Sequence, residues 1–577
     1  MINTATTEKK STWKVLKLAL SNRKTGFMLL FGFASGLPFA LFLGTLYAWL
    51  TEAEVELETM GVFSLIGLAY AFQFLWSPLI DKVNIKGFRR LGRRKQWIVP
   101  AQILIGVILL LLSFSEPSNE SIGWFSLLAG IGALASATQD IAINAWRIDN
   151  ADEEATLDIL STIYQMGYRL AALVGGAFGL IIAARMGWPQ TYMIMGAILV
   201  AIGIIGLWAP DNDAGKASRD GVVDDQLLDL RKAGELEPGI RWRALAIVAS
   251  LWAGAIGAVL TFMIMSLTFA PENRPDATDF TVNWGPWIII ATVVLPALVA
   301  GWLAAQKRDG KHLLAEDAAP SSGGAFALDH LYRALLLPLI EFVGRMGWSL
   351  VLIIALVLTY RVCDAIWGTF AYPFYLGELA YTNDEVAFAS KFFGVGAIIL
   401  GLALGGYMLT VLGRMLTLTI GALLAALTNL LYADLAIGGA RMLAFSDAIG
   451  FTWLIEQLPG GSAKLAKLTI TIGFENLAIG IAGAAYIAWL SSIVSKQYSA
   501  VQYALLSSLT LLIGTLGRGA LGEMIEEQGY YEVFIFTTLI GFIAVFLCVL
   551  EWARIARQGR RPELIRSLYR TSNTNLR

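Results

Sequence analysis

Four polar side chains lie close together near the end of a long apolar stretch, in the segment SATQDIAINAWRID. They are Gln139, Asp140, Asn144 and Arg147, and no charged residue occurs between Ile122 and Gln139. Asp140, Asn144 and Arg147 are spaced by four and three positions, so on a helix they share one face. A carboxylate in a bilayer costs about 2.5–3.5 kcal/mol on insertion scales and usually faces a bundle interior or a watery cavity. The segment therefore predicts a polar seam inside a membrane bundle.

A second carboxylate, Glu475, follows an apolar run and precedes Asn476. Neither Asp140 nor Glu475 has an opposite charge three or four residues away, so each must pair with another helix, meet water or carry a proton. We therefore predict that both acids couple transport to protons. A third acid, Asp364, is assigned the same role, although a structural ion pair with Arg361 and extension of Arg361 to the membrane interface both stay open.

The composition indicates a membrane protein that crosses the bilayer many times. Of 577 residues, 56% are hydrophobic and 15% are charged, and the mean hydropathy is +0.63. Apolar runs of about 20 residues, the length needed to span a bilayer, recur along the chain. We predict fourteen spans at 26–50, 59–80, 97–114, 122–146, 159–184, 189–209, 242–269, 286–306, 348–378, 385–411, 414–436, 467–492, 499–520 and 531–552.

Lysine and arginine predict the orientation of these spans. They gather before the first span, in the loop DKVNIKGFRRLGRRKQW after the second, and in the C-terminal tail, whereas the first loop, TEAEVELE, is acidic. By the positive-inside rule, both termini are cytoplasmic. Two cysteines and two histidines suggest neither a disulfide framework nor a metal site, and the polar N-terminal segment does not resemble a cleaved signal peptide.

The spacing of the spans predicts two six-helix halves separated by an insert with two extra spans, an arrangement with internal repeats typical of secondary transporters. Within the insert, HLYRALLLPLIEFVGRM is either an amphipathic helix on the membrane surface or an extension of the next span. The glycine-rich segment 437–464 is expected at the outer interface. The predicted parts are a cytoplasmic segment 1–25, an N-terminal half 26–210, the insert 211–346, a C-terminal half 347–555 and a basic tail 556–577.

The other polar groups inside the spans suit a charged, sugar-like solute. Arg169 and Lys391 would hold carboxylates through charge-assisted hydrogen bonds. Side-chain amides both donate and accept, as sugar hydroxyl and acetamido groups require; these are Gln73, Gln139, Asn144, Gln165, Asn476 and Gln502. Aromatic rings would either stack on sugars or pack the helices; these are Tyr164, Tyr168, Trp367, Tyr372 and Phe374.

The basic cluster after the second span has a different predicted role. Asp81 precedes it, and Arg93 and Arg94 lie within it. We interpret the three residues as a conformational latch combined with a topology signal, in preference to a ligand site.

Several long segments resemble the AmpG-type muropeptide permeases. FGFASGLPFALFLGTLYAWL, GVFSLIGLAYAFQFLWSPLID, GRRKQW and SATQDIAINAWRID follow one another at the spacing of that family, and FENLAIGIAGAAYIAWLSSIVSKQYSAVQYALLSSL is similar in the second half. The resemblance covers most of both halves and leaves out 211–345 and 437–464. It places functional positions at Gln139, Asp140, Tyr168, Arg169, Asp364, Glu475 and Asn476.

This resemblance implies an all-α major facilitator fold in the bacterial inner membrane. It implies import of N-acetylglucosaminyl-anhydro-N-acetylmuramyl peptides by proton symport, for cell-wall recycling and with an indirect effect on β-lactamase induction and antibiotic resistance. The expected partners are this glycopeptide and the lipid bilayer. We expect a monomer with no nucleic-acid partner, no catalytic residue, no metal, and no cofactor apart from the coupling proton.

Three alternatives stay open. A related permease could carry another anionic solute, such as a peptide, a sugar phosphate or a coenzyme A derivative. A membrane-embedded enzyme would need a nucleophile or metal ligands, yet the apolar spans contain no histidine and no repeated acidic metal-binding pattern. A receptor built on a permease fold would be expected to lack the internal acids, which this chain retains.

Overall fold

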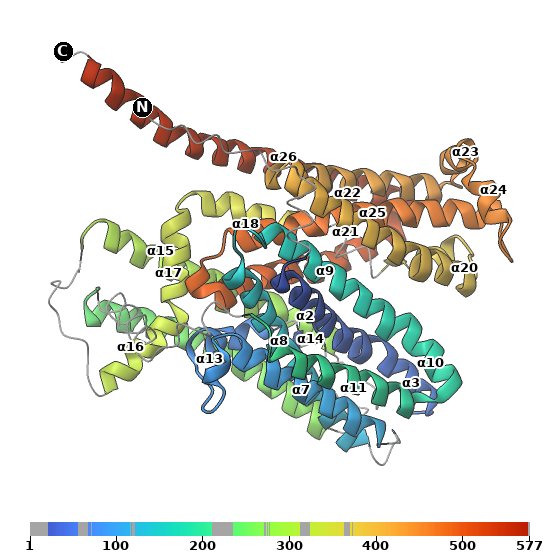
Figure 1. Ribbon diagram of the computed structural model, residues 1–577, viewed down its shortest axis with the longest axis horizontal. Coiled ribbons are helices and arrows are strands. Elements are labelled where there is room, and N and C mark those ends of the chain that lie inside the picture. Colours follow the sequence, from blue (N-terminus) through green and yellow to red (C-terminus); the bar gives the residue numbers. More distant parts are fainter. Residues whose placement is uncertain are drawn as a thin grey trace. The chain divides into compact units, whose positions relative to one another are not determined.

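The computed structural model of the chain is helical (Figure 1). It describes residues 21–574, except 56–66, 68, 71, 116, 118–121, 211–234, 270–272, 274, 276, 312–323, 363–369 and 372. Within these ranges the regular elements are α-, π- and 3-10 helices, and none is a β-strand. The prediction of an all-α membrane protein is confirmed.

Eleven helices in the described ranges are long and apolar enough to cross a membrane. They coincide with eleven of the fourteen predicted spans. They are Arg23–Glu52, Lys95–Ser113, Gly123–Asn150, Leu157–Met186, Trp188–Gly206, Pro238–Ser266, Asn283–Arg308, Asn383–Val411, Arg414–Ala436, Ala463–Ser492 and Met524–Arg557. The predicted spans 59–80 and 499–520 include residues that are not fully described. The count of fourteen and the orientation therefore stay predictions.

A bent pair of helices gives a twelfth candidate span. Helix α17 (Leu337–Met346) and helix α18 (Ser349–Thr359) meet at an angle of 105°. Gly347 lies at the bend with φ +54°, a conformation that glycine adopts at little cost. The choice between an amphipathic helix on the membrane surface and an extension of the next span stays a prediction.

The chain divides into two compact units. The first contains residues 1–347 and 490–516, and the second contains 348–489 and 517–577. The last long helix, α26 (Ser499–Thr574), runs through both and is interrupted at Gly529, where φ is +80°.

In the first unit, helix α2 (Arg23–Ala40) lies directly against helix α9 (Leu157–Leu173), as Figure 1 shows. A Cβ on Gly32 would lie 2.3 Å from the carbonyl oxygen of Tyr164. A Cβ on Gly167 would lie 2.3 Å from the carbonyl oxygen of Leu29. Only glycine fits at either position, so the two backbones touch, as small residues allow in membrane helices.

Both of these helices continue through a π-helical turn. Helix α2 passes through η1 (Leu41–Thr45) into α3 (Leu46–Glu52), and α9 passes through η5 (Val174–Phe178) into α10 (Gly179–Met186). The two π-helical turns contact each other. The contact between the two helices thus continues as far as their π-helical turns, which lie against each other.

Three further helices complete the first bundle. Helix α7 (Lys95–Ser113) packs between α11 (Trp188–Gly206) and α8 (Ile122–Asn150), and α8 also contacts α2. Helix α8 carries the polar face predicted from the sequence. Its position against α2 and α9 determines which side chains surround Asp140.

The insert adds its own helices to the first unit. Helix α14 (Ala277–Ile289) continues through η7 (Ile290–Val294) into α15 (Leu295–Arg308), and helix α13 (Pro238–Thr268) packs against η7 and α15. On α16 (Gly324–Leu335), Asp329 accepts a 2.5 Å hydrogen bond from Arg241 of α13, and both side chains are buried. This ion pair ties α16 to the inserted spans.

The second unit repeats the glycine-mediated contact. Helix α20 (Asn383–Ala387) continues through η9 (Phe388–Phe393) into α21 (Gly394–Val411). A Cβ on Gly401 of α21 would lie 2.2 Å from the carbonyl oxygen of Leu477, on α25 (Ala463–Ser492). Helix α22 (Arg414–Ala436) packs beside α21.

The segment 437–464 forms two short helices, α23 (Ala440–Ala448) and α24 (Phe451–Glu456). Each follows a glycine in the left-handed region, Gly439 and Gly450. Trp453 and Leu454 are exposed on α24. Their expected location at the membrane interface stays a prediction.

We predict that Gly32→Ala destabilises the first unit, because its methyl group would enter the space of the Tyr164 carbonyl. Overpacking of this kind costs about 1–3 kcal/mol. Gly26→Ala on the same helix is the matched control, since a Cβ there meets nothing within 4 Å. The measurement is the thermal unfolding temperature of each purified variant, which should be lower for Gly32→Ala than for Gly26→Ala. Equal unfolding temperatures would contradict the backbone contact.

Candidate functional site

Asp140 is held by two hydroxyl groups from neighbouring helices. Its Oδ1 accepts hydrogen bonds from Ser35 Oγ of α2 at 2.6 Å and from the Tyr164 hydroxyl of α9 at 2.7 Å. The two hydroxyl oxygens are 3.1 Å apart. Asp140 forms no ion pair with any described residue. The glycine contact between α2 and α9 is what brings both hydroxyls to the same carboxylate.

Aromatic side chains surround this carboxylate. The Tyr70 hydroxyl donates to Ser136 Oγ at 2.8 Å, and the Tyr70 ring packs edge-on against Phe39 at 5.2 Å. Phe39 also contacts Tyr168 at 6.0 Å, and Tyr168 contacts Tyr164 at 6.2 Å. The tyrosines therefore pack on one another, and their stacking on sugar rings stays a prediction.

Several predicted amide groups are buried without partners among the described residues. Both amide atoms of Gln139 and the Oε1 atom of Gln73 lack a hydrogen bond. Asn144 donates through Nδ2 to the Asp140 carbonyl at 2.9 Å, while its Oδ1 has no partner. A buried polar atom left unpaired costs about 1–3 kcal/mol. Such atoms are available to a ligand that brings its own donors and acceptors.

The other predicted residues of the first unit have different environments. Gln165 is buried on α9, and Arg169 lies half-buried one turn further along. Gln502 donates to the Pro338 carbonyl at 2.8 Å and to Glu341 at 2.7 Å, both on α17. Its Oε1 accepts from the Ser495 amide. Gln502 thus links α26 to the insert, and its contact with substrate stays a prediction.

A second tyrosine-bound carboxylate lies in the second unit. Glu475 of α25 accepts a short hydrogen bond from the Tyr432 hydroxyl of α22. That hydroxyl is 2.8 Å from the hydroxyl of Tyr375, on the π-helix η8 (Pro373–Glu378). Both predicted coupling acids are therefore bound by tyrosine hydroxyls supplied by other helices.

The remaining predicted residues of the second unit do not form one cluster. Asn476 donates to the Ile472 carbonyl at 2.9 Å, and Lys391 lies exposed on η9. Phe374 is fully buried among aromatic rings that include Tyr432 and Phe534. Asp364, Trp367 and Tyr372 lie outside the described residues. Their roles stay predictions.

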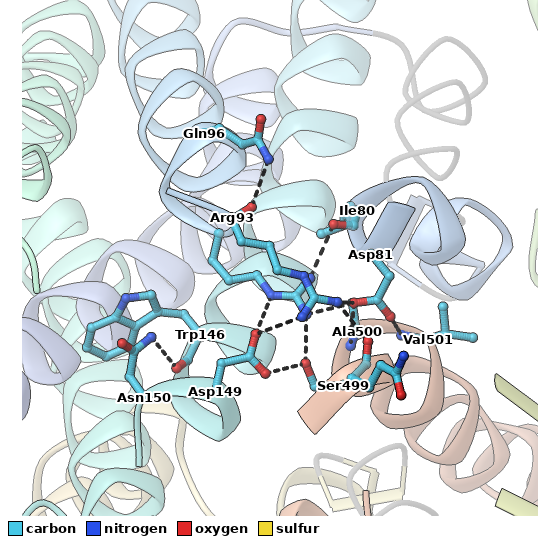
Figure 2. A network of polar contacts seen from close by, with 12 residues as sticks. Ile80, Asp81, Arg93, Gln96, Trp146, Asp149, Asn150, Ser499, Ala500 and Val501 are labelled. Carbon is cyan, nitrogen blue, oxygen red and sulfur yellow. Dashed lines mark hydrogen bonds and ion pairs between the residues drawn. The ribbon is translucent and has the colours of Figure 1, made fainter. Parts of the chain in front are cut away.

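Asp81, on helix α6 (Ser77–Lys82), and the basic cluster form a buried network (Figure 2). Asp81 Oδ1 accepts from Arg94 at 2.7 Å and from Arg93 at 3.3 Å. Arg94 also donates from Nε to Asp149 at 2.7 Å. Ser499 accepts from Arg94 and donates to Asp149 at 2.7 Å. Two carboxylates therefore surround one buried guanidinium.

The first turn of α26 completes this network. The backbone amide of Val501 donates to Asp81 Oδ2 at 2.9 Å, and that of Ala500 lies 3.4 Å from Oδ1 (Figure 2). The positive end of a helix dipole favours a carboxylate at this position. The latch interpretation thus has a defined geometry: one carboxylate holds the arginine cluster and the start of α26 together.

The charge of Asp81 is stable in this setting. Burial by itself would raise the pKa of Asp81, but Arg94, Arg93 and the Val501 amide outweigh it and hold the pKa below its ordinary value. Because the pKa of Asp81 is lower in the folded protein than in the unfolded chain, its ionised form stabilises the fold at any pH above the ordinary carboxyl pKa. This stabilisation is lost only as the pH falls through the lowered pKa. Asp81 is therefore ionised at neutral pH.

Sequence patterns alone did not identify several residues of these clusters. Ser35 and Tyr375 are ordinary residues in apolar stretches, and Tyr432 lies 43 positions from its partner Glu475. Nothing in the local sequence separates Asp149 from the other charges at the end of its helix. The spacing of Arg147 places it on the polar face but indicates no role for it. For Ser35, Tyr375 and Tyr432, the only local signal is a polar side chain inside an apolar stretch.

Comparisons with known proteins agree on a transporter. A family model described as acetyl-coenzyme A transporter 1 matches residues 26–123. The anhydromuropeptide permease of Escherichia coli strain K12 is 27% identical over 541 residues, covering 92% of this chain and 81% of that protein. A protein of Rickettsia felis named putative transporter AmpG 4 is 25% identical over 518 residues, and the alignment covers 89% of this chain and 93% of that protein.

A solved structure supports the fold independently. The human organic anion transporter MFSD10 superimposes with a TM-score of 0.52 at 13% sequence identity, covering 91% of this chain and 99% of that one. Identity this low carries information on the fold alone. Together with the apolar helices, these comparisons show that the chain is similar over most of its length to the AmpG-type permeases, with a major facilitator fold that crosses the bacterial inner membrane many times.

Proposed function

We propose that the protein imports anhydro-muropeptides into the cytoplasm by proton symport. The observation that carries the proposal is Asp140, a carboxylate on a membrane-spanning helix that is bound only by the hydroxyls of Ser35 and Tyr164 within the described structure. The similarity to the E. coli permease along 92% of the chain supports the choice of substrate. Import of these fragments would supply cell-wall recycling and would bear on β-lactamase induction.

The surroundings of Asp140 suit the exchange of a proton. An ionised carboxylate without a cationic partner is costly in apolar surroundings. Protonation removes that charge, and the freed hydroxyls of Ser35 and Tyr164 still offer hydrogen bonds. A change of access from one side of the membrane to the other would let Asp140 take up a proton outside and release it inside. Glu475 is the corresponding candidate in the second unit.

The unpaired amide atoms suit a glycopeptide. Gln139 and Asn144, on the same helix as Asp140, have buried donors or acceptors that form no hydrogen bond with any described residue. Acetamido and hydroxyl groups of amino sugars are both donors and acceptors and would complete them. In this proposal the protein positions its substrate by hydrogen bonds and changes no covalent bond, so it is a transporter without enzymatic activity.

A second candidate substrate is a coenzyme A derivative. The match of residues 26–123 to the acetyl-coenzyme A transporter family favours it. This match covers only the first spans, whereas the similarity to the anhydromuropeptide permease extends over most of the chain. We therefore rank the muropeptide first.

Uptake by purified protein in proteoliposomes tests the proposal. We expect labelled anhydro-muropeptide to accumulate when the outside is more acidic than the inside, and a protonophore to abolish the accumulation. Labelled acetyl-coenzyme A serves as the competing substrate in the same vesicles. Uptake of acetyl-coenzyme A in the absence of muropeptide uptake would replace the first proposal by the second.

Asp140→Asn should abolish proton-driven accumulation while the protein stays folded. Asparagine keeps the acceptor oxygen for Ser35 and Tyr164 but cannot exchange a proton at neutral pH. Exchange of labelled for unlabelled substrate across the membrane should continue, because it needs no net proton movement. Glu153→Gln removes an exposed carboxylate nearby in the chain and should behave as the wild type. Normal accumulation by Asp140→Asn would rule out its coupling role.

Asp81→Asn should loosen the start of α26. The variant loses the charge that holds Arg93 and Arg94, although Arg94 keeps Asp149 as a partner. Hydrogen exchange of the amides at 497–503 should become faster. Asp152→Asn breaks an exposed ion pair with Lys24 and should leave these amides unchanged. Identical exchange in both variants would argue against the latch.

A further inference from the structure

Arg147 is a buried cation whose donors are largely unused. It shares a face of α8 with Asp140 and Asn144, and its side chain is fully buried. Its Nη2 donates to Ser491 Oγ at 2.9 Å, but its Nε and Nη1 have no hydrogen-bond partner among the described residues. A guanidinium is charged at every physiological pH, so the side chain cannot avoid this by losing its proton.

Two tyrosine rings hold the guanidinium in place. The Cζ atom of Arg147 lies 4.9 Å from the ring centre of Tyr164 and 5.2 Å from that of Tyr503. Contact with aromatic faces stabilises a cation without satisfying its N–H groups. The arrangement therefore fixes the position of the group and leaves its donors available.

Two other buried arginines of this unit are paired with carboxylates. Arg94 pairs with Asp81 and Asp149, and Arg241 pairs with Asp329. No carboxylate pairs with Arg147 among the described residues, although burial without an opposite charge is costly. The missing partner is an anion that the described residues do not provide.

We propose that Arg147 binds a carboxylate of the transported molecule. This inference rests on the proposed function and specifies one contact in it. A guanidinium holds a carboxylate by charge-assisted hydrogen bonds. Arg147 would thus recognise the peptide stem of a muropeptide, while the amides of Gln139 and Asn144 serve its neutral groups.

The acceptor on Asn144 favours a peptide carboxylate over a phosphate. Its unpartnered Oδ1 is on the same helix face, three residues before Arg147, a separation of about 5–6 Å between Cβ atoms. The last residue of a peptide carries an amide N–H and a carboxylate on either side of one carbon atom. Asn144 Oδ1 would accept a hydrogen bond from this N–H while Arg147 binds the carboxylate. A phosphate group has no N–H beside it and therefore does not match this arrangement.

Tyr164 connects this contact to Asp140. Its hydroxyl donates to Asp140 Oδ1 at 2.7 Å, and its ring lies against Arg147. A substrate anion that draws Arg147 away from this ring also disturbs the tyrosine that binds the coupling acid. Substrate binding and proton exchange thereby share one side chain.

Binding measurements on the purified full-length protein test the inference. The probes are an anhydro-muramyl tripeptide with free carboxylates and the same compound with those carboxylates amidated. We expect the wild type to bind the acid at least tenfold more tightly than the amide. Arg147→Gln should bind both with the weaker affinity of the amide. Arg185→Gln, which removes an exposed arginine, is the matched control and should keep the wild-type preference.

The outcomes separate this inference from the proposed function. If the wild type binds neither compound, the proposed function fails and the inference with it. If the wild type prefers the acid but Arg147→Gln keeps that preference, or loses affinity for both compounds equally, only the role of Arg147 is overturned. If Arg147→Gln does not fold, Arg147→Lys provides the test. Its preference for the acid over the amide should be smaller than that of the wild type, because lysine offers a hydrated point charge in place of a planar guanidinium. An unchanged preference would overturn the role of Arg147.

Discussion

The cost of burying a charge away from water governs where the charged residues of these sites lie. Three solutions to it appear in the first unit. Arg94 is surrounded by two carboxylates, Asp140 is bound by hydroxyls, and Arg147 rests between tyrosine rings. The charge of Arg94 is balanced by carboxylates of the protein itself, which suits a structural role. The other two lack an opposite charge among the described residues, and we propose that Asp140 exchanges protons and that Arg147 binds a substrate anion.

Close contact between helix backbones makes these sites possible. Gly32 and Gly167 let α2 and α9 touch, and the same pair of helices carries Ser35 and Tyr164. In the second unit Gly401 lets α21 reach α25, the helix of Glu475. Side-chain hydroxyls are short, so they reach a carboxylate on a third helix only if their own helices are closely packed. The small residues thus determine the precision of the polar sites.

Much of this organisation follows from local patterns in the sequence. Hydropathy predicts the spans, because each must satisfy the same bilayer thickness. The four-and-three spacing of Asp140, Asn144 and Arg147 predicts their shared face. The partners of these residues could not be predicted in the same way. Ser35 is 105 positions from Asp140 in the chain, and the tie between Gln502 and α17 spans 161 positions. Such contacts depend on tertiary packing, which no local period encodes.

The facing π-helical turns η1 and η5 have a mechanical consequence for the first unit. A π-helical turn holds one more residue than an α-helical turn and is a common site of bending. Each turn separates a helix section that bears Ser35 or Tyr164 from a section beyond it, α3 or α10. The stiffness of the pair is therefore lowest at one level along both helices. We therefore expect strain applied to the far sections to be absorbed at that level, so that the hydroxyls around Asp140 keep their spacing while the rest of the helix pair bends.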